Sequence, residues 1–379
     1  MKVAIIVGTR PEIIRLSIII KKCKKYFDTV LIHTGQNWDS KLSDIFFEEL
    51  DIPKPDYYLD CSKENLGENM GLIIHKTYDV LLKEKPDALL VLGDTNSCLS
   101  VIPAKRLKIP IFHMEGGNRC FDFRVPEEIN RRITDHISDI NLCYTENSRK
   151  YLINEGMVRD NVFVVGSPMP EIMEYYGGKI NNSNILETVS KNNGINIEPK
   201  KYLLVSIHRE ENLDIGNNLS NIMSSIVKTS DILNMPVIFS THPRTKKKLD
   251  KLNIDIDSPN IIWSEPFGYL DYVNLIKNSY CFVSDSGTIS EEVAHLNVPG
   301  VTIRSSIERP EAIENGNIIM TGLDYNNIVE SIKFSVDSHK NNGKKSVPYD
   351  YTVMDTSDRV IKIILSYYHS INEKTWFKY

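Results

Sequence analysis

Acidic, basic and histidine side chains are concentrated in residues 113–132, which read HMEGGNRCFDFRVPEEINRR. Glu115 follows an apolar segment, and Glu127 opens a segment with helical spacing behind a proline. Asp94 follows another apolar segment, in LGDT. Carboxylates that share a partly desolvated site push one another's pKa values apart, so that one donates a proton while another accepts it. The pattern predicts acid–base chemistry, and we interpret the glycine pair at 116–117 as leaving room for something bulky.

The same acids have simpler structural explanations. Glu127 and Arg131, like Glu128 and Arg132, are spaced i,i+4 on the expected helix. This spacing alone predicts surface ion pairs that contribute only about 0.3–0.5 kcal/mol each, and we expect that to be the role of one of the two glutamates. Asp94 could instead cap the start of a helix.

Two turns have the composition of anion-binding sites. In GTRPE (8–12), Arg10 lies beside the expected start of a helix, where the backbone N–H groups and the helix dipole favour an anion. In SDSGT (284–288), backbone N–H groups and hydroxyls of three residues converge at a second helix start: Ser286, Gly287 and Thr288. Glu292, one turn further, is placed to accept hydrogen bonds from a ribose diol. The alternatives are a locally paired Arg10 and a glutamate that only stabilises the first helical turn.

Histidine and arginine side chains follow two apolar segments of the second half. His208, in SIHREEN, ends one of them with an arginine beside it, and His242 and Arg244, in THPR, occupy the matching place one strand later. A histidine at the end of a strand also occurs as a purely structural residue, and that alternative stays open here.

Several classes of site lack their sequence signature. GTRPE contains no second or third glycine, which argues against the GxGxxG turn of NAD- and FAD-binding proteins. His113 with Glu115, and Asp135 with His136, are isolated pairs without an HExxH motif, so we expect no metal. GxSxG is absent, which argues against a serine nucleophile.

Apolar, β-branched segments alternate with helically spaced ones along the chain. A polar, Asn-rich stretch around 180–198 separates two such series. The expected strands are 3–7, 29–33, 88–92, 109–113, 140–144 and 162–166, then 202–206, 236–240, 260–263, 280–284 and 300–304; the clearest helices are 11–26, 66–84 and 127–138. This rhythm predicts an α/β protein of two Rossmann-like, doubly wound parallel-sheet domains with a cleft between them. We expect domains at 1–169 and 170–355, with a C-terminal helix at 356–379 that crosses back to the first.

Length and composition narrow the class of protein. A chain of 379 residues is longer than the length at which a single hydrophobic core stops growing, which favours two domains. The net charge of -5 gives no overall attraction to nucleic acid or to anionic lipid. Six scattered cysteines without a CxxC pair suit a reducing compartment, and we expect buried thiols. No apolar run suits a signal peptide or a membrane span, so we expect a cytoplasmic protein.

Taken in order, the motifs resemble those of the non-hydrolysing UDP-N-acetylglucosamine 2-epimerases. They are GTRPE, GDT, HMEGG, PEEINR, HREEN, THPR, SDSG with EE, and ERPE at 308–311, and they span almost the whole chain. The resemblance implies a GT-B-like fold, with UDP held mainly by the second domain and the sugar against the first. It also implies a homodimer that uses no redox or metal cofactor and inverts C2 of a UDP-2-acetamido sugar. UDP is eliminated to leave a 2-acetamidoglycal and is added back after C2 is protonated on the other face.

The resemblance also implies roles for individual residues. The catalytic residues would be Asp94, Glu115, Glu127 and His208. The substrate-binding residues would be Arg10, Arg15, His242, Arg244, Ser286, Gly287, Thr288 and Glu292. Arg15 stands where lysine is usual, HMEGGNRCFD replaces HxEAGLRTGD, and SDSGT replaces SDSGG.

These departures bear on the substrate. NRCFDFRVPEEINR, SDSGT and the C-terminal NEKTWFKY resemble the UDP-N-acetyl-L-fucosamine synthase branch, which acts on UDP-2-acetamido-2,6-dideoxy-L-talose in capsule and O-antigen pathways. A branch acting on UDP-2,3-diacetamido-2,3-dideoxyglucuronate shares NRCFD and PEEINR, and UDP-N-acetylglucosamine 2-epimerase, which forms UDP-N-acetylmannosamine, is a further alternative. More distant alternatives are a GT-B glycosyltransferase and a catalytically silent nucleotide-sugar sensor.

Overall fold

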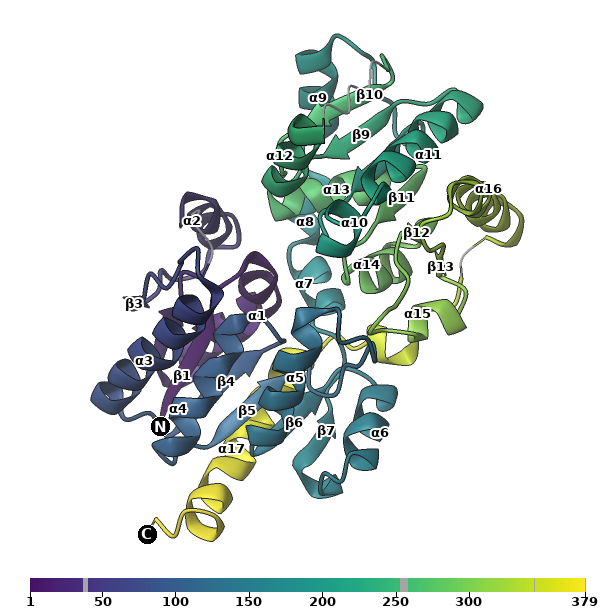
Figure 1. Cartoon of the computed structure of the whole chain (residues 1–379). Helices are drawn as coiled ribbons and strands as arrows, with labels where there is room; N and C mark the ends of the chain where they lie inside the picture. The colour runs from purple at the N-terminus through teal and green to yellow at the C-terminus, as the bar shows by residue number, and fades with distance from the viewer. Residues whose placement is uncertain (37–39, 253–257, 344, 379) are drawn as a thin grey trace. The chain divides into compact units, whose positions relative to one another are not determined.

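The computed structural model describes residues 1–36, 40–252, 258–343 and 345–378 (Figure 1). The last residue of the NEKTWFKY motif, Tyr379, lies outside these residues. The chain forms two compact units. Unit 1 contains Met1–Glu174 and Thr352–Tyr379, and unit 2 contains Tyr175–Tyr351.

Unit 1 is built on a parallel sheet of seven described strands in the order β3-β2-β1-β4-β5-β6-β7. The strands are β1 (Lys2–Val7), β2 (Asp28–His33), β3 (Tyr57–Tyr58), β4 (Ala88–Leu92), β5 (Ile111–Met114), β6 (Ile140–Cys143) and β7 (Val162–Val164). The central strands are continuous apolar runs, as expected for strands that are covered on both faces. The strand order changes direction between β1 and β4, and at such a point the loops beyond the two strands diverge and leave space for a ligand.

The helices of unit 1 begin and end at recognisable signals. They are α1 (Arg10–Tyr26), α2 (Ser40–Glu49), α3 (Leu66–Glu84), α4 (Val101–Arg106), α5 (Pro126–Ile137), α6 (Glu146–Asn154), α7 (Met169–Tyr175, which ends at the first residue of unit 2) and α17 (Thr356–Lys374), with the 3-10 turns η1 (Asn96–Ser100) and η2 (Arg159–Asn161). α1 starts with a capping box between Thr9 and Glu12 and has proline in its first turn, as the GTRPE motif predicts. α3 ends where Lys85 adopts a left-handed conformation.

The C-terminal helix α17 belongs to unit 1 and packs against α1 (Figure 1). The side-chain hydroxyl of Thr356 donates to the carbonyl of Val165 at 3.2 Å, and Lys22 pairs with Asp358 at 2.5 Å. The chain passes from unit 1 to unit 2 at the end of α7, and Thr352–Tyr379, which contain α17, belong to unit 1 again.

Unit 2 repeats the plan with six described strands in the order β10-β9-β8-β11-β12-β13. They are β8 (Leu203–Ser206), β9 (Val237–Ser240), β10 (Ile261–Ser264), β11 (Cys281–Ser284), β12 (Gly300–Thr302) and β13 (Ile318–Met320). Leu203 and Val205 pack into one apolar cluster, and Tyr202 and Leu204 pack into another. Because alternate residues of a strand face opposite sides, both faces of this sheet are buried. The order changes direction between β8 and β11.

The helices of unit 2 are mostly short connections between parallel strands. They are α8 (Gly177–Asn181), α9 (Ile185–Asn193), α10 (Glu210–Leu213), α11 (Asn218–Leu233), α12 (Pro243–Leu252), α13 (Tyr269–Asn278), α14 (Ile289–Leu296), α15 (Glu311–Glu314) and α16 (Tyr325–Asn342), with the 3-10 turn η3 (Tyr349–Tyr351). α14 follows β11 directly and carries the SDSGT motif at its start.

The predicted α/β class is confirmed, and the eleven predicted strands are present with ends shifted by at most two residues. The two short strands β3 and β13 were not predicted. All six cysteines are free thiols; five are buried as predicted, but Cys120 is only half-buried. No helix within the described ranges combines the length and the apolar character that a membrane span requires.

We expect Gly166→Ala to destabilise unit 1. Gly166 has φ +84°, and a Cβ there would lie 2.5 Å from the Cβ of Val353, in the segment that returns to the unit. A left-handed alanine costs about 1–2 kcal/mol, and overpacking adds about 1–3 kcal/mol. Gly156, at φ +92°, has no atom within 4 Å of such a Cβ, so Gly156→Ala is the matched control. Urea denaturation should show the larger loss for Gly166→Ala. Val353→Ala should rescue it in part, because it removes two Cγ atoms that would lie 2.6 and 2.9 Å from the new Cβ but keeps the Val353 Cβ. Equal losses in the two glycine variants would contradict the packing argument.

Candidate active site

The predicted site residues follow the strands at which each sheet changes direction. In unit 1, Arg10 comes after β1, and Asp94 comes after β4. In unit 2, His208 comes after β8, and Ser286 comes after β11. Ligands of open α/β sheets bind beyond the carboxyl ends of the strands at these points. The topology therefore identifies one candidate binding region in each unit.

Glu115 is held by two donors from different elements. It follows β5 in a left-handed conformation, with φ +67°, which is unfavourable for a residue with a side chain. Its Oε2 pairs with Nη1 of Arg15 from α1, and its Oε1 accepts a hydrogen bond from Nδ2 of Asn118 at 3.1 Å. Glu115 and Arg15 are both buried. These partners favour an ionised carboxylate at this position.

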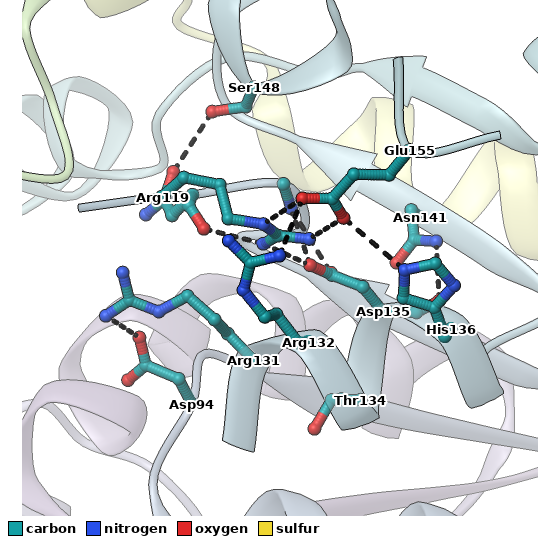
Figure 2. Close-up of polar contacts among 12 residues, drawn as sticks. Asp94, Arg119, Arg131, Arg132, Thr134, Asp135, His136, Asn141, Ser148 and Glu155 are labelled. Carbon is teal, nitrogen blue, oxygen red and sulfur yellow. Dashed lines mark hydrogen bonds and ion pairs between the residues drawn. The ribbon is translucent and has the colours of Figure 1, made fainter. Parts of the chain in front are cut away.

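Asp94 is paired with an arginine from α5. Nη2 of Arg131 lies 2.8 Å from the Asp94 carboxylate (Figure 2). Nη1 of the same guanidinium lies 3.1 Å from Glu128. Asp94 and Glu115 follow neighbouring strands, and a Cβ added to Gly93 would lie 3.9 Å from Oε2 of Glu115. The structure thus brings two predicted acids to adjacent strand ends. The N-cap of η1 is Thr95, so the alternative role of Asp94 as a cap is wrong.

Glu127 and Glu128 have different environments. Glu128 is buried and accepts hydrogen bonds from Arg131, Arg132 and the backbone N–H of Cys120. The surface ion pair predicted for Glu128 is therefore a buried one. Glu127 is half-buried in the first turn of α5, and no ion pair or hydrogen bond of its side chain is found among the described residues. An i,i+4 pair was expected for one of the two glutamates: Glu128 forms it with Arg132 at 3.0 Å, whereas Arg131 binds Asp94 and Glu128.

The glycine pair at 116–117 does not leave room for a ligand. A Cβ on Gly116 would lie 2.9 Å from the Asn141 side chain, and one on Gly117 would lie 2.3 Å from the carbonyl oxygen of Ser148. Gly117 also has φ +82°. The space beside both residues is occupied by protein atoms, so that interpretation is wrong: the glycines allow the loop to pack closely against β6 and α6.

The histidines considered as metal ligands have other partners. Nδ1 of His113 lies 2.9 Å from Asp135, not from Glu115, and Nε2 of His136 lies 3.4 Å from Glu155. Burial opposes the charged imidazole of His113, but the Asp135 carboxylate and the Gly93 carbonyl raise its pKa above the usual value. Over the described ranges, no group of three or more His, Cys, Asp and Glu side chains is arranged to hold a metal ion.

Glu12 is a buried acid that the sequence analysis did not select. Its Oε2 accepts hydrogen bonds from the N–H groups of Gly8 at 2.5 Å and Thr9 at 3.1 Å, and its Oε1 accepts one from the Thr95 hydroxyl at 2.5 Å. Burial raises the pKa of Glu12 to about 7, against the effect of these donors, and the nearby Asp94 charge adds to the rise. Glu12 thereby connects the turn after β1 with the turn that carries Asp94. Its position in a capping box was the available signal.

In unit 2, His208 is positioned by Asp285. This buried carboxylate accepts the backbone N–H of His208 at 3.0 Å and that of Arg209 at 2.9 Å, and it lies 3.2 Å from Nδ1 of the His208 ring. The side chain of Asn212 donates to it as well, at 3.0 Å. The SDSGT motif contains Asp285, but its role was not predicted. The His208 ring lies 5.7 Å from the ring of His242.

The predicted anion site is at the start of α14, where Thr288 is the N-cap. The hydroxyls of Ser286 and Thr288 lie 2.9 Å apart, and Nη1 of Arg309 donates to the Gly287 carbonyl at 2.5 Å. A Cβ on Gly287 would lie 3.0 Å from Arg309 and 3.6 Å from Arg209, so two guanidinium groups converge on this turn. Neither arginine was predicted to bind substrate.

The remaining predicted residues have the following surroundings. Glu292 is buried in the first turn of α14. Arg10 is the first residue of α1, and its guanidinium lies 5.8 Å from the ring centre of Phe46. Arg244 pairs with Glu210 at 2.6 Å and with Asp214 at 2.7 Å. The charge of Arg244 is therefore already partly neutralised by acids of its own unit.

Comparison with known proteins finds relatives along the whole chain. A family model described as UDP-N-acetylglucosamine 2-epimerase matches residues 21–365. The structure of UDP-N-acetylglucosamine 2-epimerase from Rickettsia bellii is 45% identical, with a TM-score of 0.91 and 100% of both chains covered. That of the Methanocaldococcus jannaschii enzyme, in complex with UDP-GlcNAc and UDP, is 35% identical, with a TM-score of 0.89 and 97% of this chain and 100% of that chain covered. A UDP-2,3-diacetamido-2,3-dideoxy-D-glucuronate 2-epimerase from Pseudomonas aeruginosa is 34% identical, with 89% of this chain and 92% of its own covered. The predicted family and GT-B-like fold are confirmed.

We expect Glu12→Gln to change how stability depends on pH. The pKa of Glu12 rises from 4.5 to about 7 on folding, so the folded state binds the proton more tightly and loses stability as pH rises between these values. Glutamine does not titrate, so the variant does not lose stability in this way as pH rises. Its free energy of unfolding, relative to the wild type, should improve by about 3 kcal/mol from pH 4.5 to pH 7.5.

Urea denaturation of both proteins at each pH measures this difference, and groups common to the two proteins cancel. A constant difference across the pH range would show that Glu12 has an ordinary pKa in the folded protein.

Proposed function

Because the chain belongs to the UDP-N-acetylglucosamine 2-epimerase family of isomerases, we propose that it inverts C2 of a UDP-2-acetamido sugar by eliminating UDP and adding it back. The observation that carries the proposal is the pair Asp94 and Glu115. These acids follow neighbouring strands, and each is paired with an arginine that is itself buried. A C2 proton is weakly acidic, so its removal needs a base held within hydrogen-bond reach.

In the proposed reaction, a carboxylate of unit 1 removes the C2 proton. The electrons of the C–H bond form the C1=C2 double bond of a 2-acetamidoglycal, and the C1–O bond breaks with its electrons on UDP. A second acid protonates C2 from the other face, and UDP adds back to C1. Asp94, Glu115 and Glu127 are the proposed acid and base groups. Glu127 is half-buried, and its carboxylate forms no ion pair or hydrogen bond with the described residues, so it is available for proton transfer.

Unit 2 is proposed to hold the uridine diphosphate. The N–H groups at the start of α14 and the hydroxyls of Ser286 and Thr288 suit a phosphate, and Glu292 suits the ribose diol. His208, oriented by Asp285, is the proposed contact to the leaving diphosphate. The other proposed substrate-binding residues are Arg10, Arg15, His242, Arg244 and Gly287. Cationic groups and helix N-termini stabilise the charge that develops as UDP leaves.

For the sugar itself, we propose UDP-2-acetamido-2,6-dideoxy-L-talose, converted to UDP-N-acetyl-L-fucosamine for surface polysaccharide synthesis in the cytoplasm. The NRCFDFRVPEEINR and SDSGT motifs support this choice. UDP-N-acetylglucosamine and UDP-2,3-diacetamido-2,3-dideoxyglucuronate are the competing substrates, and each is named in relatives of this chain. NMR of the purified protein with each of the three sugars would rank them by kcat/KM.

A deuterium experiment separates epimerisation from the rival functions. In D2O, the proposed reaction should place one deuterium at C2 of the product, because the second acid, which exchanges its proton with solvent, delivers a deuteron to C2 while the proton removed from C2 stays on the first carboxylate. A glycosyltransferase that transfers the sugar, or a silent sensor, would leave C2 protonated. Mass spectrometry and proton NMR of recovered sugars measure the exchange, and a protonated C2 with all three sugars would remove the proposal.

We expect Glu115→Gln and Asp94→Asn to lower kcat by about 100- to 10,000-fold while UDP binding is retained, because each change removes a proton-transfer group and keeps its shape. Calorimetry with UDP and turnover measured by NMR test the two effects separately. Glu146→Gln is the control, since this glutamate of α6 is exposed and pairs with Arg149 at i,i+3 on the same helix. Turnover unchanged in both acid variants would remove these acids from the mechanism.

We also propose a homodimer that uses the exposed face of α3. This face carries apolar side chains that a soluble monomer would leave in water, including Tyr78 and Leu82. Leu82→Glu should shift the mass measured by light scattering toward the monomer, whereas Leu365→Glu, at an equally exposed position on α17, should leave it unchanged. A monomeric wild-type protein would exclude the dimer.

A further inference from the structure

Behind the proposed acids lies a fully buried group of charged side chains. Asp135, in the last turn of α5, pairs with Nδ1 of His113 at 2.9 Å and with Nη1 of Arg119 at 2.7 Å. Nη2 of Arg119 lies 2.6 Å from the carboxylate of Glu155 (Figure 2). The side chains of His113, Asp135 and Arg119 have no exposed surface. These residues cannot touch a substrate, and the proposed reaction does not use them.

The hydrogen bonds fix the charge of His113. Its Nε2 lies 2.7 Å from the carbonyl oxygen of Gly93, which only accepts, so Nε2 carries a proton. Its Nδ1 faces the Asp135 carboxylate, which also accepts. A ring with donors on both nitrogens is an imidazolium. The positive charges of His113 and Arg119 are then balanced by the negative charges of Asp135 and Glu155, which is the condition for burying such a group.

Through His113, the group holds the turn that carries Asp94. Gly93 adopts φ +77°, donates its N–H to the Met114 carbonyl at 3.0 Å and accepts from His113 through its own carbonyl. Hydrogen bonds therefore hold both the N–H and the carbonyl of Gly93. The next residue is Asp94, and the orientation of the Gly93 carbonyl sets the direction in which the Asp94 backbone continues.

Through Asp135, the same group holds the loop that carries Glu115. The backbone N–H of Gly117 donates to Asp135 at 3.2 Å, and that of Glu115 donates to Leu142 at 3.0 Å. Glu115 lies between these contacts in its left-handed conformation. A residue keeps such a conformation only where its surroundings impose it.

We infer that the His113–Asp135 pair positions Asp94 and Glu115 for proton transfer by holding the backbones of Gly93 and Gly117. The inference rests on the proposed function, in which Asp94 and Glu115 exchange protons with the substrate. His113 and Asp135 are positioning residues, because their effect reaches the substrate only through these two turns.

Two substitutions of one residue separate positioning from general stability. The amide nitrogen of asparagine can replace Nδ1 of histidine, and that of glutamine can replace Nε2. His113→Asn therefore keeps a donor toward Asp135 but leaves the Gly93 carbonyl with only the weak Cys98 thiol donor, at 3.2 Å, among the described residues, whereas His113→Gln keeps the stronger donor toward Gly93. Both variants lose the imidazolium, so they should be destabilised to a similar extent.

We expect His113→Asn to lower kcat by about 10- to 100-fold with little change in KM, because a small displacement of a reacting group has an effect of this size. His113→Gln should retain kcat within a few-fold. Backbone hydrogen exchange at residues 93–95 should be faster in His113→Asn than in His113→Gln. Glu155→Gln is the control: it weakens the pair with Arg119 but leaves both turns held, so stability should fall without a change in kcat.

Equal losses of kcat in the two His113 variants, or an unchanged kcat in a folded His113→Asn, would overturn the inference. Failure of the proposed function is recognised separately, by turnover that survives in Asp94→Asn. In that case the hydrogen-exchange comparison judges the positioning role, and equal exchange at 93–95 in the two His113 variants would overturn it.

Discussion

A carboxylate that is removed from water must receive hydrogen-bond donors and a compensating charge, and unit 1 is arranged around this requirement. Isolated buried charges cost several kcal/mol, whereas exposed ion pairs contribute at most about 1 kcal/mol. Glu115 is matched by Arg15, Asp94 and Glu128 share Arg131, and Asp135 is matched by Arg119. The arginines concentrated in residues 113–132 are therefore explained first by acids of unit 1, several of which lie outside that segment.

The sheets supply the positions at which such pairs form. Parallel strands end at one edge, so residues far apart in sequence, such as Arg15 and Glu115, meet there without long loops. In unit 2, a single buried carboxylate has the corresponding role: Asp285 accepts the N–H groups that begin α10 and orients the His208 ring. Both units thus use a buried acid behind the strand ends to fix the backbone of a proposed site residue.

The sequence predicted the features that depend on local pattern. Apolar, β-branched runs identified the long strands, and the GTRPE and SDSGT motifs identified two helix starts. It did not predict β3 and β13, which have two and three residues and carry too little pattern. The burial of Glu128 and the ion pair between Arg131 and Asp94 were not predicted either, because both depend on tertiary contacts.

The glycine pair at 116–117 is a second case in which tertiary contacts, not local sequence, decide the role of a residue. Two adjacent glycines indicate that side chains are excluded, but the excluded volume is filled by Asn141 and by the backbone of Ser148. Only the packing of β6 and α6 shows that the neighbour is protein. For the same reason Asp135 was considered only beside His136, although its partners are His113 and Arg119, which are distant in sequence.

Glu12 differs from the acids of unit 1 that pair with arginine, because its partners are two backbone N–H groups and the Thr95 hydroxyl. Burial raises its pKa to about 7, and the Asp94 charge adds to the rise. Thr95 follows Asp94 and donates to Glu12, so it joins the turn after β4 to the start of α1. Near neutral pH, Glu12 can therefore be protonated or ionised, and its charge changes close to Asp94.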